Sequence, residues 1–96
     1  MITDELRAPG TSEPRHGDYE RASREVADEY RRARLRHDPM HSGHEGWAVI
    51  REELDELWEL VRADQSHTMA AYIEAKQIAA MAVAFMVEVA EQPLDA

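Results

Sequence analysis

Hydrophobic residues recur at steps of three and four along three stretches of the chain, a spacing that places them on one face of an α-helix. These stretches predict helices over about 18–37, 44–63 and 67–91. The alternation with a period of two that marks a half-buried strand is absent from the sequence. The pattern therefore predicts an all-α protein with three helices in each protomer.

Capping residues indicate where the first two helices begin. Asp18 is a suitable N-cap for the first helix, and the connector at 37–44 contains Pro39, a residue that interrupts helices. Ser42 is followed three residues later by Glu45, which is the spacing of a capping box. We therefore expect the second helix to begin near residue 44.

The third helix differs from the others because it is apolar on nearly every side. It follows a short turn at 63–67, with Asp64 or Ser66 as the expected cap, and should stop before Pro93. Nearly every residue over 78–90 is apolar. A helix that is apolar all round is buried all round, and two helices of the same short chain can hardly cover it. We expect a helical bundle that is completed by a second subunit.

The chain has 96 residues, enough for one small domain. Pro and Gly residues over 9–14 interrupt regular structure, so 1–17 should form a flexible tail and 18–96 a single helical domain. The absence of Cys excludes disulfides and Cys-based zinc sites. The N-terminal sequence does not resemble a signal peptide, and no apolar run is expected to span a membrane. These features predict a cytoplasmic protein without a membrane partner.

The formal net charge is −9. This charge argues against binding to a nucleic acid polymer, which requires a basic surface. It does not exclude a nucleotide substrate, because metal ions can bridge an acidic protein and a polyphosphate.

The acidic residues of the second helix fall into two groups on the helical surface. Glu52, Asp55 and Glu59 share a side with basic residues, which is typical of a solvated face. Glu53 and Glu56, three residues apart, project from another side that is bracketed by apolar residues. The second group is therefore the candidate for chemistry.

Glu74 shares a sector of the third helix with large apolar residues, and its polar neighbour is Gln77. A buried carboxylate needs a partner or takes up a proton. Because the short turn makes the two helices antiparallel, Glu74 and Gln77 are expected to face Glu53 and Glu56. Three carboxylates and an amide oxygen would form an all-oxygen site of the kind that Mg²⁺ or Mn²⁺ prefers. Alternatively, Glu53 and Glu56 pair with arginines of the first helix or of another subunit.

Two acidic motifs also carry a resemblance to a known family. They read E-E-L-D-E-L at 52–57 and E-A-K-Q at 74–77. Together they resemble the motifs of the MazG-like, all-α nucleoside triphosphate pyrophosphohydrolases, which show Glu-Glu-x-x-Glu on one helix and Glu-x-x-Asp on the next. The segments 44–49 and 77–82 are similar to a compact bacterial and phage branch. The resemblance covers about 18–91.

The resemblance implies a Mg²⁺-dependent enzyme that cleaves an NTP or dNTP to the nucleoside monophosphate and pyrophosphate, with Mn²⁺ as another suitable ion. It implies catalytic and metal-binding roles for Glu53, Glu56 and Glu74, with Glu52 assisting behind them. It also implies a homodimer or homotetramer. Gln77 stands where the family has Asp, so its carbonyl would bind a metal without charge, orient a water or contact the substrate.

Other residues are weaker candidates for substrate binding. Arg34 belongs to a run of four arginines that could grip phosphates or, alternatively, compensate the helix dipole. Lys76 could reach a neighbouring site or lie at a subunit edge. His44 could contact a base or phosphate, and Trp47 could stack on a base, although the connector histidines can also face solvent and Trp47 can belong to the core.

Two other functions also fit the sequence. One is a non-catalytic helical bundle that acts as an interaction module, which the small size and Gln77 favour. The other is a nucleotide-binding sensor that binds its ligand without turnover. Metal-dependent release of pyrophosphate distinguishes the enzyme from both.

Overall fold

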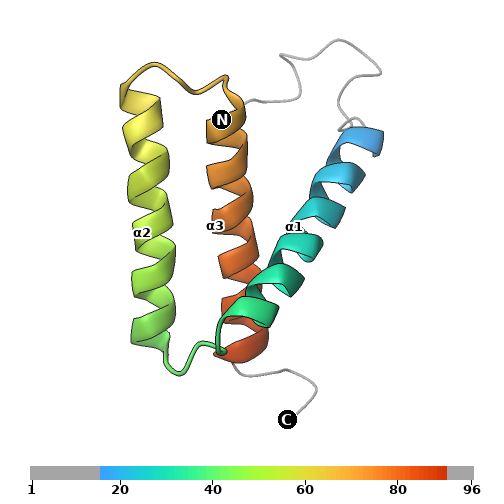
Figure 1. Ribbon diagram of the computed structural model, residues 1–96, viewed down its shortest axis with the longest axis vertical. Coiled ribbons are helices and arrows are strands. Elements are labelled where there is room, and N and C mark those ends of the chain that lie inside the picture. The colour runs from blue at the N-terminus through green and yellow to red at the C-terminus, as the bar shows by residue number, and fades with distance from the viewer. Residues whose placement is uncertain (1–15, 91–96) are drawn as a thin grey trace, which may run out of the picture.

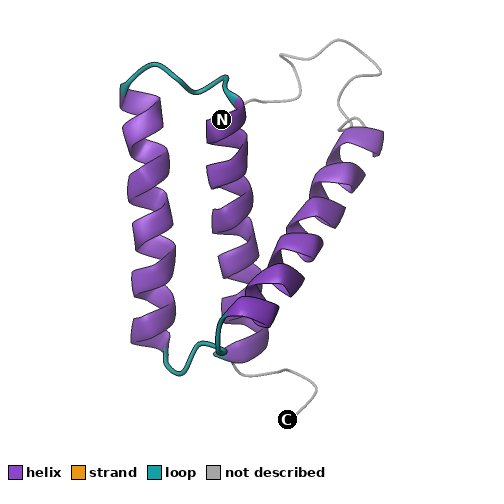
Figure 2. Ribbon diagram, viewed as in Figure 1, coloured by secondary structure: helices purple, strands orange, loops and turns teal. Residues whose placement is uncertain are grey.

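The computed structural model describes residues 16–90, in which all regular structure is helical (Figure 2). Its elements are α1 (His16–Arg36), α2 (Gly43–Arg62) and α3 (Met69–Glu88). Figure 1 shows α3 in the middle of a single layer, with α2 antiparallel on one side and α1 leaning away on the other. Within the described residues, α1 and α2 each pack against α3 but not against each other. The prediction of an all-α protein with three helices is confirmed.

The first helix begins earlier than predicted. Asp18 lies inside the first turn of α1 and pairs with Arg21 at 3.0 Å, so it is not the N-cap. Its carboxylate still suits the positive end of the helix dipole. The predicted tail over 1–17 lies outside the described residues, except that 16 and 17 are the first two residues of α1.

Ser42 caps α2 as predicted. Its hydroxyl oxygen accepts a 3.0 Å hydrogen bond from the backbone N–H of Glu45. The Glu45 carboxylate reaches one residue further back than in the usual capping box and accepts from the backbone N–H of His41. This bond anchors the α1–α2 connector to the first turn of α2.

The turn between α2 and α3 differs from the prediction. Thr68, rather than Asp64 or Ser66, is the N-cap of α3, and its hydroxyl oxygen accepts from the backbone N–H of Ala71 at 3.2 Å. The same hydroxyl donates to the Gln65 carbonyl at 2.8 Å, which holds the turn together. Asp64 has a φ of 61°, a left-handed conformation that ends α2. α3 then stops at Glu88, before the expected end at 91.

A single copy of the chain covers α3 poorly. The only buried hydrophobic residues among those described are Ala71, Ala80 and Ala84, and no large side chain among them is fully buried. This poor burial agrees with the expectation that two helices of the same chain can hardly cover α3. Large hydrophobic side chains on α2 and α3 are instead exposed, among them Trp47 at 56% and Trp58 at 58%.

α3 also corrects the expectation that no apolar run could span a membrane. By length and composition it qualifies as a span, with a mean hydropathy of 1.4 over its most apolar window. The signal is weak by itself, because the core helix of a soluble protein meets the same criterion. Glu74, Lys76 and Gln77 lie within this helix and interrupt its apolar surface.

Candidate metal site

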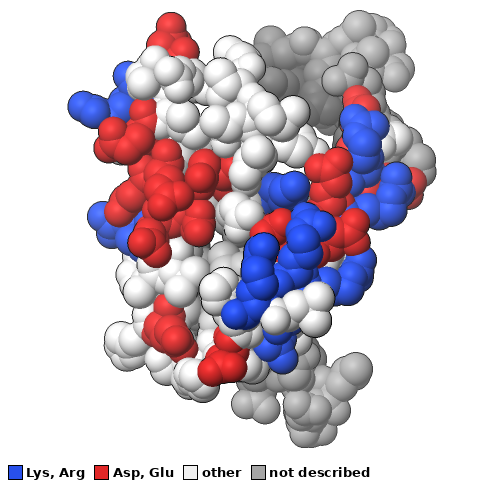
Figure 3. Space-filling model, in the orientation of Figure 1, with Lys and Arg blue, Asp and Glu red and all other residues white. Residues whose placement is uncertain are grey.

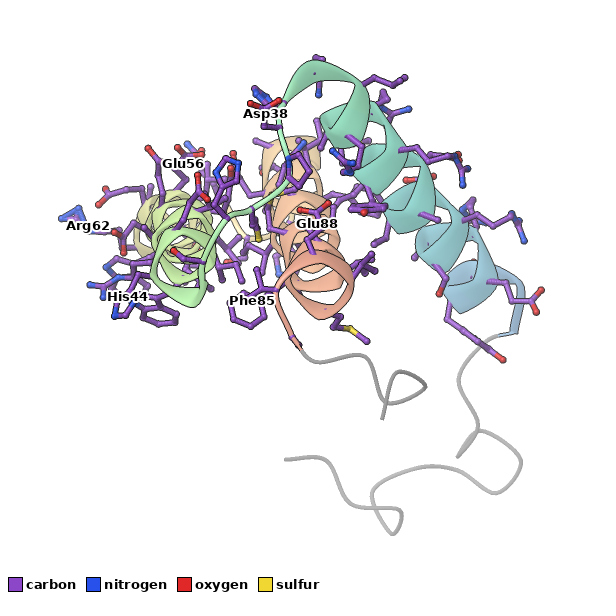
Figure 4. The ribbon with its side chains drawn as sticks, turned by 90° about the horizontal axis from the view of Figure 1, so that it is seen from below. Asp38, His44, Glu56, Arg62, Phe85 and Glu88 are labelled. Atoms are coloured by element: carbon purple, nitrogen blue, oxygen red, sulfur yellow. The ribbon has the colours of Figure 1, made fainter. Side chains whose placement is uncertain are left out.

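Three carboxylates from two helices converge on one point. Glu53 and Glu56 come from α2 and Glu74 from α3, and one oxygen of each lies within 4.8 Å of the others. In Figure 4, Glu56 points to the same side of the layer as Asp38 of the connector, whereas His44 and Phe85 lie on the opposite side. The convergence expected from helical spacing is therefore present. Glu53 and Glu74 are half-buried, but Glu56 is exposed rather than facing inward.

The electrostatics of this triad are unfavourable without a positive partner. Burial raises the pKa of Glu53 to about 7, and the neighbouring carboxyl groups of Glu74 and Glu56 contribute further. The pKa of Glu56 is raised mainly by the charge of Glu74. One oxygen of Glu74, Oε1, is buried and has no hydrogen-bond partner. An oxygen in this state costs free energy that a cation would offset.

The other acids over 52–59 lie on the solvated face of α2, as predicted. Glu52, Asp55 and Glu59 are exposed. Asp55 pairs with Arg51 at 3.1 Å, and Glu59 pairs with Arg62 at 3.2 Å, both along the same helix. These exposed pairs contribute little to stability.

Gln77 is engaged through its amide nitrogen. Its Nε2 donates a 2.8 Å hydrogen bond to Oε2 of Glu29 on α1. Burial acts to raise the pKa of Glu29, but hydrogen bonds from Arg32 and Gln77 outweigh it and hold the pKa below its ordinary value. Sequence reasoning missed Glu29. A signal was present, because Glu29 is three residues after Val26 and four before Ala33, which puts it on the apolar stripe of α1.

An open cavity of about 530 Å³ reaches the triad at Glu53, whereas Glu56 and Glu74 do not line it. It lies between the helices and the α1–α2 connector. Glu52 and Glu53 contribute acidic groups to its wall, Arg34 and Arg36 contribute basic groups, and Gln77 lies between them on α3. Figure 3 shows the same division on one face of the molecule, with acidic groups gathered over α2 and basic groups over α1.

The four arginines over 31–36, which were expected either to grip phosphates or to compensate the helix dipole, are all paired within the chain. Arg31 pairs with Asp28, while Arg32 and Arg36 both pair with Glu29. Arg34 Nε lies 3.1 Å from the carboxylate of Glu88. Arg34 and Arg36 nevertheless line the cavity.

Glu88 is a second, largely buried carboxylate that the sequence did not single out. Besides Arg34, it accepts hydrogen bonds from the Tyr30 hydroxyl and from the backbone N–H of Met40, both at 2.9 Å. It thereby joins the end of α1 and the connector to the end of α3. This clamp shapes one end of the cavity, which His37 and His41 also line.

Three of the weaker candidates lie away from the cavity. His44 and Trp47 are exposed residues of α2 that do not line it. Lys76 lines a separate groove of about 190 Å³ between α1 and α3, together with Val26 and Tyr72. Arg34, Glu52 and Gln77 thus line the cavity, but these three residues do not.

Comparison of this chain with protein-family models, with curated proteins and with solved structures finds no match. The resemblance to the MazG-like family therefore rests on short sequence motifs alone. A function for this protein has to be supported by the geometry of the triad and its cavity.

Proposed function

We propose that this protein is a Mg²⁺-dependent nucleotide pyrophosphohydrolase that cleaves a (d)NTP to the (d)NMP and pyrophosphate. The observation that carries the proposal is the convergence of Glu53, Glu56 and Glu74, with a buried and unpartnered oxygen on Glu74. The volume of the adjoining cavity, about 530 Å³, lies within the range of small-molecule sites.

The residues fit a hard divalent cation. All the converging donors are carboxylate oxygens, which Mg²⁺ and Mn²⁺ prefer over softer ligands. The raised pKa of Glu53 reflects burial and crowding of negative charge that a cation would relieve. When bound, such an ion would offset charge on a phosphate chain and lower the pKa of water.

The chain's own residues would bind and orient the substrate. The open cavity beside the triad gives a nucleotide room to place its phosphates next to Glu53. Arg34 and Arg36 on the α1 wall offer guanidinium groups to phosphate oxygens. To bind phosphate, they would have to share or exchange their present partners, Glu88 and Glu29.

We also propose that the protein functions as a homodimer or homotetramer in the cytoplasm, without a membrane or a nucleic acid polymer as partner. The support is that one copy leaves eleven large hydrophobic side chains exposed and has no large side chain fully buried among its described residues. On α2, Trp47, Leu54 and Val61 recur every seven residues and make a stripe with Trp58. A second copy would give this stripe the core that a chain of this size lacks.

A nucleotide-binding sensor or a non-catalytic interaction module is the second candidate. The pairing of the four arginines over 31–36 with carboxylates of the same chain favours the interaction module, because paired arginines are less free to hold phosphates. The neutral Gln77 favours it as well, because an amide supports a cation less strongly than a carboxylate.

The test is pyrophosphate release by the purified full-length chain across all common NTPs and dNTPs, with Mg²⁺ or Mn²⁺. We expect release from at least one nucleotide, its loss with EDTA, and its loss in Glu53→Gln and Glu56→Gln. Asp55→Asn is the matched control, because Asp55 lies on the same helix but faces solvent.

Three results are distinguishable. No turnover with any nucleotide would contradict the enzyme. Metal-dependent nucleotide binding without turnover would support the sensor. If the protein binds neither metal nor nucleotide, the interaction module is the hypothesis that remains.

A further inference from the structure

Glu29 is the most buried charged residue in the described chain, with an exposed fraction of 5%. Its two oxygens have different partners. Oε1 accepts from Arg32 on its own helix, at 3.2 Å from Nε and 2.8 Å from Nη2. Oε2 accepts from Nε2 of Gln77, which is 48 residues away on α3. Glu29 thus reaches across to the helix that carries Glu74.

The contact with Glu29 determines which way the Gln77 amide is turned. An amide has a donor end and an acceptor end, and in Gln77 the donor end is held toward α1. Its carbonyl oxygen is therefore turned away from Glu29. Gln77 follows Glu74 by three residues, so both side chains project from one side of α3. Gln77 and Glu53 also line the same cavity.

We propose that Glu29 is a positioning residue that orients Gln77 so that its carbonyl oxygen completes the cation site of Glu53, Glu56 and Glu74. This inference rests on the proposed function. Without Glu29 the terminal amide torsion is broad, so the oxygen has no preferred direction. A hydrogen bond from the amide to a carboxylate also increases the negative charge on the carbonyl oxygen, as outer partners do for other metal ligands. Glu29 and Gln77 together then act in place of one carboxylate.

A purely structural role for Glu29 makes a different prediction. Glu29 joins α1 to α3, and so does Glu88, whose side chain is 9% exposed and accepts bonds from Tyr30 and Met40. Glu88 contacts neither Gln77 nor the triad in any described interaction. If joining the helices were the whole role, Glu29→Gln and Glu88→Gln would weaken cation binding to a similar degree.

The first measurement uses the metal-free full-length protein. Side-chain amide resonances are recorded by NMR on ¹⁵N-labelled protein, with Gln77 assigned through its loss in Gln77→Ala. We expect Glu29→Gln to shift the Gln77 amide protons upfield, and Glu88→Gln to leave them in place. An unchanged Gln77 resonance in Glu29→Gln would overturn the orienting contact without reference to any metal.

The second measurement is Mn²⁺ affinity by calorimetry for the wild type, Glu29→Gln, Gln77→Ala, the double variant and Glu88→Gln. We expect Glu29→Gln and Gln77→Ala each to weaken binding about tenfold or more. The double variant should bind no more weakly than Gln77→Ala alone, because Glu29 acts through Gln77. Glu88→Gln should stay within about twofold of the wild type.

The outcomes separate the two proposals. Three results would overturn the role of Glu29 while leaving the cation site intact. The double variant could lose Mn²⁺ affinity by the product of the two single losses, Glu29→Gln could bind Mn²⁺ as tightly as the wild type, or Glu88→Gln could lose as much affinity as Glu29→Gln. A wild type that binds no Mn²⁺ would overturn the cation site itself and the positioning role with it.

Discussion

Gly46 of α2 and Phe85 of α3 approach so closely that a β-carbon on Gly46 would lie 2.6 Å from Cδ2 of the Phe85 ring. The sulfur of Met40 would be only 3.0 Å from the same β-carbon. The absence of a side chain at Gly46 therefore lets the start of α2 pack against the end of α3 and against the connector.

Gly46→Ala is expected to destabilise the protein by about 1–3 kcal/mol, because the ring and the connector must move to admit one methyl group. Urea unfolding at a fixed protein concentration measures the change. Gly17→Ala is the matched control, because a β-carbon there meets nothing within 4 Å. Equal stability of Gly46→Ala and the wild type would contradict this close packing.

The metal-free protein is expected to become more stable as the pH falls from 8 to 5. The pKa of Glu53 is raised from 4.5 to about 7 in the folded chain, so between these values the folded state binds more protons than the unfolded state. The free energy of unfolding therefore rises as protons are added, by on the order of 1–3 kcal/mol. Stability is lost again as the pH rises through 7.

Urea midpoints measured in EDTA across this range check the pH effect. Glu53→Gln should flatten the slope, because the amide does not titrate. The lowered pKa of Glu29 affects the free energy of unfolding with the opposite sign, but only at lower pH. The stability that Glu29 contributes is lost as the pH falls below 4.5, the ordinary pKa of a Glu side chain. A slope that persists unchanged in Glu53→Gln would show that another group causes it.

Added Mn²⁺ should raise the stability at pH 7.5. Binding to the folded state alone adds about 2.7 kcal/mol at a free concentration of about 100 times Kd. Thermal unfolding with Mn²⁺ or with EDTA measures the increase. We expect Glu74→Gln to lose it, since Glu74 supplies the buried oxygen without a partner. Glu59→Gln, which changes an exposed acid paired with Arg62, should retain it.

Trp58→Glu is expected to weaken self-association at least tenfold. Trp58 is 58% exposed in one copy and belongs to the apolar stripe of α2, so a charge there would be buried without a partner in an assembly. Light scattering after size exclusion measures the mass over a dilution series. Glu59→Ala, at the adjacent and exposed position, is the control. A wild type that is monomeric, or that partitions into lipid vesicles through α3, would contradict the assembly.

Local sequence patterns predicted well which carboxylates of α2 and α3 lie close together. Glu53 and Glu56 are one helical turn apart, and a short turn separates their helix from Glu74, so helical geometry alone brings the three acids to one level. The caps were predicted less well. Thr68 caps α3, whereas Asp64 takes a left-handed conformation at the end of α2. That conformation does not follow from residue type alone.

The sequence by itself determined the three helices, the capping of α2 by Ser42 and the side of α2 on which Glu53 and Glu56 lie. These features depend on spacings of three to seven residues, which helical geometry converts directly into position. Only the tertiary structure decided that Gln77 turns its amide nitrogen to Glu29 and that Arg34 pairs with Glu88. Such contacts depend on how α1 packs across α3, and that packing is set by side-chain shape between segments far apart in the chain.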